Sequence, residues 1–164
     1  MKKKLYLFML LLTTFMISGC SSDISKLSKK LELDFPKIES SEVTDTHGGF
    51  HGDGETLIKI VFDDKTLGTQ LEGKWNKLPL SENLQTAVYG LETENERISS
   101  LIKTETGENF IPEIENGYYY FYDRNSESNN PYSDEDLLIR YSYNFSIAIY
   151  DCDNSTLYYA EIDT

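Results

Sequence analysis

The sequence predicts an α+β domain in which helices pack on one face of a mainly antiparallel sheet. Segments that alternate apolar and polar residues occur near residue 60 and again in the last third of the chain. A stretch between them has the three- and four-residue apolar spacing of helices. The final strands are separated by a short turn, as in a hairpin. Strands followed by helices and then by more strands are typical of the α+β class.

The first twenty residues predict an export signal that ends at a lipidation site. A basic start at residues 2–4 precedes an uncharged apolar run over residues 5–17, and two small residues precede Cys20. The apolar run has 13 residues, fewer than the roughly 20 that a membrane-spanning helix needs. An uncleaved membrane anchor and an ordinary secretory signal are the alternatives. The small residues before the cysteine favour lipidation over both.

The stretch Ile17-Ser18-Gly19-Cys20 resembles the lipobox of bacterial lipoproteins. The resemblance implies that diacylglycerol is transferred to the Cys20 sulfur and that the lipoprotein signal peptidase cleaves before Cys20. The expected organisation is a signal peptide over residues 1–19, a tether over 20–30 and a single α+β domain over 31–164. The expected location is the extracytoplasmic face of a bacterial cell membrane.

The tether and the first strands follow from local spacing. Ile24, Leu27 and Leu31 recur at three- and four-residue intervals and allow a short helix in the tether. Residues 39–46 are compatible with a strand, and residues 57–62 form a second one. The buried face of the second strand is expected to carry Ile58, Ile60 and Phe62.

Two amphipathic helices are expected in the middle of the chain. The first follows a start signal at Pro79–Ser81 and has apolar residues at i, i+3, i+4 and i+7, namely Leu84, Ala87, Val88 and Leu91. The second is predicted from the same spacing of Ile98, Leu101 and Ile102.

The last third of the chain returns to strands. An aromatic strand over residues 118–122 is followed by a polar loop over 123–131 and an acidic, capped helix start at 133–136. The clearest alternation covers residues 141–149, with a core face of Tyr141, Tyr143, Phe145, Ile147 and Ile149. A turn at 151–155 then returns the chain as a strand over 156–162.

The chain is strongly acidic, with 28 Asp and Glu against 15 Lys and Arg. Three of the lysines belong to the predicted signal, so 12 basic residues remain against the same 28 acids, a formal charge of −16. Such a surface repels nucleic acid and attracts cations and basic protein surfaces. We therefore expect no nucleic acid partner. A simply solvated acidic face is the favoured interpretation, and a docking surface for a basic protein partner is the alternative.

Cys152 is the second cysteine and lacks a disulfide partner once Cys20 carries lipid. It lies in the predicted turn at 151–155, and we expect a thiol without a function.

Candidate metal ligands gather between residues 45 and 55, namely Asp45, His47, His51, Asp53 and Glu55. Imidazole and carboxylate groups can bind zinc or another transition metal. The spacing matches no hydrolase motif, because His-Glu-x-x-His is absent. A glycine-rich hairpin turn with solvated side chains is the favoured interpretation, and a metal-free loop that contacts a partner is a further one. No cofactor is expected, and a divalent metal is the alternative.

Three segments, Asp45–Glu55, Trp75–Leu80 and Asn116–Tyr119, resemble a group of small proteins of low-GC Gram-positive bacteria. No role is established for that group, so the resemblance implies no catalytic residue.

The sequence as a whole predicts a lipid-anchored extracytoplasmic protein that acts by binding. Its partners would be the membrane, through lipid on Cys20, and a basic protein. The alternative is an immunity-type protein that neutralises a toxin, which small size, acidity and membrane display would suit. A metal-dependent enzyme built on the 45–55 loop is the third hypothesis.

Overall fold

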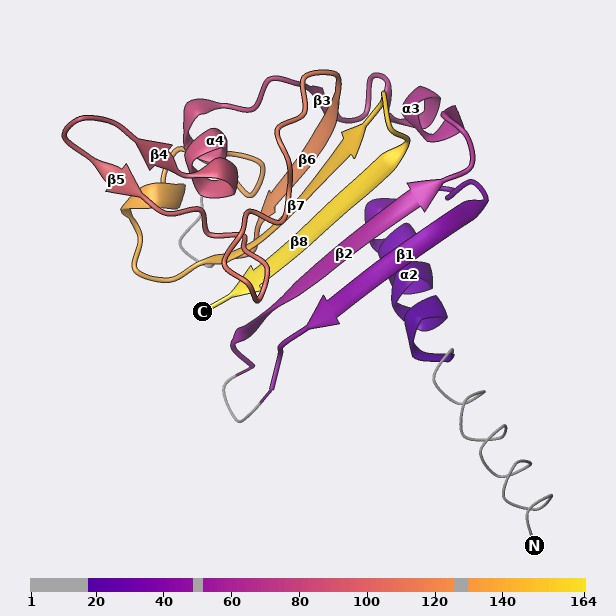
Figure 1. Ribbon diagram of the computed structural model, residues 1–164, viewed down its shortest axis with the longest axis horizontal. Helices are drawn as coiled ribbons and strands as arrows, with labels where there is room; N and C mark the ends of the chain where they lie inside the picture. Colours follow the sequence, from indigo (N-terminus) through magenta and orange to yellow (C-terminus); the bar gives the residue numbers. More distant parts are fainter. Residues whose placement is uncertain (1–17, 49–51, 126–129) are drawn as a thin grey trace, which may run out of the picture. The chain divides into compact units, whose positions relative to one another are not determined.

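A computed structural model describes residues 18–48, 52–125 and 130–164 of the 164-residue chain. The chain divides after Phe35 into two compact units. The first unit contains helix α2 (Ser18–Leu31), and the second contains every strand and the remaining helices (Figure 1). Within the described ranges, no helix has the length and apolarity needed to span a membrane.

Helix α2 confirms the short helix that the tether spacing allowed. Lys29 and Lys30 lie in its last turn, where the partial negative charge of the free backbone carbonyl groups stabilises positive side chains. The helix end is closed by two hydrogen bonds, from Leu33 N to Ser28 O at 3.0 Å and from Ser28 Oγ to Leu33 O at 2.7 Å.

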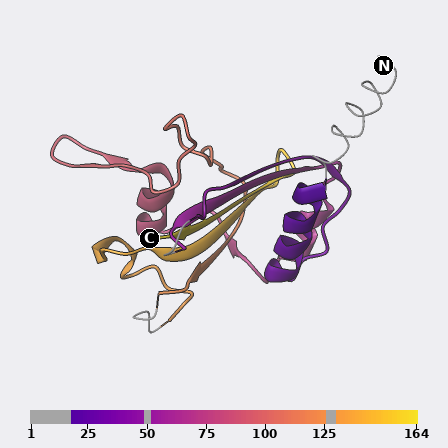
Figure 2. The same cartoon turned by 90° about the horizontal axis from the view of Figure 1, so that it is seen from below.

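The second unit is built on a six-stranded sheet in the order β1-β2-β8-β7-β6-β3, in which neighbouring strands are antiparallel. Figure 2 shows these strands as one twisted layer. The α+β class and the antiparallel sheet are therefore confirmed. The strands are β1 (Ile38–Asp45), β2 (Gly54–Phe62), β3 (Asn76–Lys77), β6 (Gly117–Asp123), β7 (Asn144–Asp151) and β8 (Thr156–Asp163).

Helix α4 (Glu82–Tyr89) packs against one face of this sheet. It begins where the Ser81 hydroxyl accepts a hydrogen bond from Leu84 N at 3.2 Å. It ends at Gly90, which has a positive φ of 83° that favours glycine. A Cβ atom at this position would also lie only 2.7 Å from Ile98 O. The core beneath it joins α4 to β6, β7 and β8 through buried side chains that include Leu84, Val88, Phe121, Phe145, Ile147, Ile149 and Ile162.

The other face of β7 is buried as well, since Ser146 and Ala148 are 1% and 0% exposed. A short helix that the sequence did not reveal, α3 (Thr66–Leu71), lies on this second face, with Gly68 beside the ring of Tyr150. Six residues are too few for an apolar period to be recognised.

The prediction of a helix over Ile98–Ile102 is wrong. The structure has two short paired strands there, β4 (Leu91–Glu92) and β5 (Arg97–Ile98). Ser100 explains the absence of a helix, because its hydroxyl donates to Val88 O at 2.7 Å and accepts from Ile102 N at 3.0 Å. Ile102 is fully buried in the core, so its apolar character reflects tertiary packing.

Two boundaries in the last third also differ from expectation. The strand expected from residue 141 begins at Asn144, and Tyr141 is fully exposed. The capped helix start at 133–136 is instead followed by a single 3-10 turn, η2 (Leu137–Ile139), and Asp136 makes no side-chain cap. By contrast, the strand at 118–122 and the hairpin through the turn at 151–155 are confirmed.

Candidate functional site

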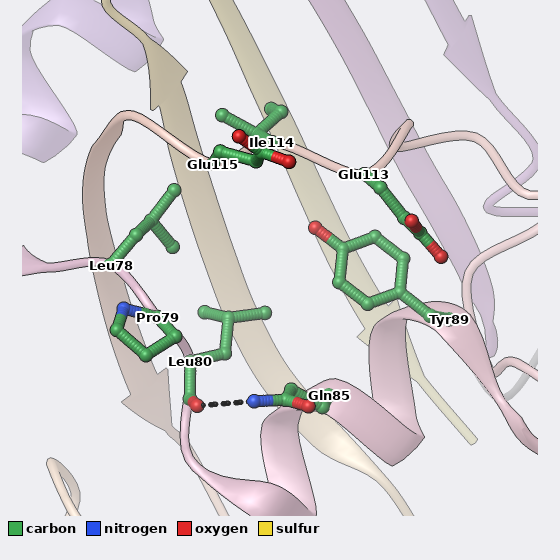
Figure 3. A pocket seen from close by; sticks show the side chains of 8 residues that line it. All are labelled: Leu78, Pro79, Leu80, Gln85, Tyr89, Glu113, Ile114 and Glu115. Atoms are coloured by element: carbon green, nitrogen blue, oxygen red, sulfur yellow. Dashed lines mark hydrogen bonds between the residues drawn. The ribbon is translucent and has the colours of Figure 1, made fainter.

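A groove of about 630 Å³ opens at the edge of the core (Figure 3). It lies between the β3–α4 connection, α4 itself and the segment that leads into β6. Its volume falls within the roughly 300–1,000 Å³ of small-molecule sites. Its lining consists of Leu78, Pro79, Leu80, Gln85, Tyr89, Glu113, Ile114 and Glu115.

The β3–α4 connection forms the first wall and is fixed at both ends. Leu78 N donates to Gly117 O at 3.1 Å, which continues the pairing of β3 with β6. Leu80 is 5% exposed and belongs to the core. Its carbonyl accepts a hydrogen bond from Gln85 Nε2 at 2.8 Å (Figure 3). The wall is therefore held in place before any ligand arrives.

The second wall combines an apolar contact with charge. Ile114 is partly buried and packs against the core, whereas Glu113 and Glu115 on either side of it are exposed. The Tyr89 hydroxyl points across the groove toward this segment (Figure 3). The groove thus has apolar walls and an acidic rim.

Tyr89 stays protonated at neutral pH. Burial raises the pKa of its phenol, a backbone hydrogen bond with Ile114 acts in the opposite direction, and the charge of Glu113 raises the pKa further. The Tyr89 hydroxyl is therefore available as a neutral hydrogen-bonding group in the groove.

The structure brings part of the predicted 45–55 cluster together. His47 Nδ1 lies 2.8 Å from Asp45 Oδ1 and 3.2 Å from Thr56 Oγ1. His47 Nε2 lies 3.2 Å from Asp163 Oδ2, on the last residue of β8. Sequence reasoning missed Asp163 as a partner. The only signal was the register of β2 with β8, which pairs Gly54 with Asp163 and cannot be read from one segment.

The other candidates do not join His47. Glu55 follows the alternation of β2 and points to the face opposite Thr56. Burial raises the pKa of Glu55, and the charge of His47 opposes this shift. Asp53 is exposed, and His51 lies outside the described residues. In residues 18–48, 52–125 and 130–164, no group of three or more His, Cys, Asp and Glu side chains could hold a metal ion. The metal site stays a prediction.

His47 and Asp163 belong to a larger polar network. Arg124 Nη2 donates to Asp163 Oδ1 at 2.7 Å, and Arg124 Nη1 lies 3.5 Å from Glu161 Oε1. Tyr159 Oη donates to Glu161 Oε2 at 2.6 Å, and burial together with this bond raises the pKa of Tyr159. Because these charges are paired with one another, the network ties the β1–β2 hairpin to β8.

Cys152 does not line the groove. Cys152 is partly buried, and burial followed by the charges of Asp151 and Asp153 raises the pKa of its thiol. A raised pKa reduces the thiolate fraction and with it the reactivity. Cys20 lies within α2, and its lipidation stays a prediction.

Comparison with protein-family models, curated proteins and solved structures finds no match for this chain. The groove was also beyond sequence reasoning, which identified Pro79–Ser81 only as a helix start. Its two walls are more than thirty residues apart in the chain, and neither contains a recognisable motif.

Proposed function

We propose that the protein is a lipid-anchored extracytoplasmic binding protein, and that the groove receives an apolar side chain of a partner protein. The single observation that carries this proposal is the groove itself, an open hollow with Leu78, Leu80 and Ile114 in its walls. The usual form of a binding site is a concave surface with apolar walls and a few polar groups, and this groove combines apolar walls with a polar rim. The resemblance of Ile17–Cys20 to a lipobox supports the membrane attachment.

Binding accounts for the groove better than catalysis does. The described lining includes no histidine, cysteine or serine, and its two carboxylates, Glu113 and Glu115, are exposed at the rim. Its walls are held by hydrogen bonds and core contacts, as shown by Leu78 and Leu80. A rigid wall lowers the entropy that is lost when a ligand binds.

The test is to map ligand binding on the full-length protein in detergent micelles by amide NMR. The probe is a mixture of hexapeptides with a fixed leucine at the third position and random residues elsewhere. We expect shift changes confined to residues 78–80, 85–89 and 113–115. Shift changes that map only to other surfaces, or none at millimolar peptide, would overturn the proposal.

A blocking variant sharpens this test. Gln85→Trp places a large ring at the exposed mouth of the groove and should abolish the shift changes. Glu82→Trp is the matched control, because Glu82 is exposed on the same helix but does not line the groove. Equal binding by wild type and Gln85→Trp would also contradict the proposal.

A further inference from the structure

We infer that the segment bound in the groove carries a lysine or arginine beside its apolar side chain. This inference rests on the proposed function, because it names the chemistry of the occupant of the same groove. It follows from which groups line the groove, how they are already bonded, and which charges surround them.

The polar groups of the groove are mainly acceptors of hydrogen bonds. Glu113 and Glu115 offer four carboxylate oxygens and no donor. The Gln85 amide nitrogen already donates to Leu80 O. The remaining side-chain donors are the second amide hydrogen of Gln85 and the Tyr89 hydroxyl, whose pKa burial raises further above neutral. An occupant that satisfies this lining must supply N–H donors, as an ammonium or a guanidinium group does.

The charges of Glu113 and Glu115 at the rim are not balanced by a cationic side chain among the described residues. None of the described lysines, arginines or histidines lines the groove. Neither Glu113 nor Glu115 forms an ion pair within the part of the chain that the structure describes. Asp63, by contrast, is an exposed acid that pairs with Lys37. The groove therefore presents negative charge that a cation on the occupant would neutralise.

The two kinds of group are arranged on opposite sides. The connection with Leu78 and Leu80 supplies an apolar wall, and the segment with Glu113 and Glu115 faces it (Figure 3). An apolar side chain between the walls therefore leaves a neighbouring basic side chain free to reach the acidic rim. The formal charge of −13 on the whole chain adds a long-range attraction for such a segment.

The test compares two peptides that differ only in charge, acetyl-Gly-Leu-Lys-Gly-amide and its counterpart with norleucine in place of lysine. Binding to the full-length protein in detergent is followed by amide shifts in the groove. We expect the lysine peptide to bind about fivefold more tightly at low salt, which is the size expected of two exposed ion pairs. We expect this preference to shrink in 0.5 M NaCl, because salt screens exposed charges.

Two double variants test whether the preference for the lysine peptide depends on the acids of the groove. Glu113→Gln/Glu115→Gln should remove it, and Glu105→Gln/Glu108→Gln should retain it, because these exposed acids lie outside the groove. Both variants change the net charge equally, so a loss of preference in both would assign it to the whole surface and overturn the inference.

The failure of the inference differs from that of the proposed function. Equal binding of both peptides in the groove would overturn the basic partner and leave the groove as a binding site. No groove shifts with either peptide or with the hexapeptide mixture would overturn both.

Discussion

His47, in the loop after β1, reaches Asp163 at the end of β8, with 3.2 Å between Nε2 and Oδ2 across 116 residues of chain. Its other ring nitrogen faces Asp45 at 2.8 Å. A neutral imidazole can donate through only one nitrogen, whereas the imidazolium donates to both carboxylates. The protonated ring therefore links the loop after β1 to β8 through its hydrogen bond with Asp163.

The free energy of unfolding should consequently fall as the pH rises through the range in which His47 loses its proton. Burial lowers the pKa of His47, but the bonds to Asp45 and Asp163 outweigh it and the net shift is upward. The pKa of His47 is thus higher in the folded protein than its value of about 6.5 in the unfolded chain. Protonation of His47 therefore adds to the free energy of unfolding below about pH 6.5, and this contribution is lost as the pH rises through the pKa of the folded protein. Urea unfolding between pH 6 and 9 should show this fall in wild type and much less of it in His47→Gln. A His47 pKa below 6.5 by NMR would contradict the assignment.

Ile147→Ala should destabilise the protein by about 2–5 kcal/mol, because its side chain is fully buried and its loss leaves a cavity. The matched control is Ile139→Ala, in a side chain that is 77% exposed, where we expect a change within about 0.5 kcal/mol. Urea unfolding measures both changes in the free energy of unfolding, provided that its dependence on urea concentration is the same in each variant. Similar costs at the two positions would show that the β7 face is not the core.

Asp123→Ala should cost about 3–5 kcal/mol, because it removes the partner of a buried cation. Arg140 Nη1 donates to Asp123 Oδ2 at 2.8 Å, and the two side chains are only 10% and 2% exposed. The exposed pair of Lys37 with Asp63 is the control, and Asp63→Ala should cost much less, because solvent screens that pair. If Asp123→Ala together with Arg140→Met were no more stable than Asp123→Ala alone, the unpaired charge would not be the cause.

Cys20→Ser should abolish lipidation and leave an uncleaved precursor. Two acyl chains suffice for stable anchoring, since each buried methylene contributes about 0.8 kcal/mol. Labelling cells with a fatty-acid analogue, followed by a gel that separates precursor from mature protein, measures both effects. Cys152→Ser is the control and should be labelled like wild type. Equal label on Cys20→Ser would reject the lipoprotein hypothesis.

Local patterns in the sequence predicted most of the sheet but not the contacts between distant segments. The β7–β8 hairpin follows from the alternation through Ile147 and the turn at 151–155, because both signals lie within neighbouring residues. Ile98 and Ile102 have the spacing of a helix, but Ile98 pairs with Leu91 across the short β4–β5 strands and Ile102 is buried in the core. The pairing of His47 with Asp163 depends on the register of β2 with β8, which no local pattern specifies.

The candidate site was the least predictable part of the molecule. Its apolar walls contain Leu80, a core residue, and Ile114, which is partly buried against the core, and neither differs in sequence from other apolar residues of the chain. Its acids resemble the many other exposed acids of the chain. The groove exists only because the β3–α4 connection and the 113–115 segment stand apart at the edge of the sheet.

The most direct test of the groove as a binding site is an isotope-filtered NOE measurement between a bound peptide and the protein. The full-length protein would carry 13C-labelled methyl groups, and acetyl-Gly-Leu-Lys-Gly-amide would be unlabelled. We expect NOEs from the peptide leucine methyls to the methyls of Leu78, Leu80 and Ile114. NOEs from the bound peptide only to methyls outside the groove, such as those of Val43 on β1, would contradict it.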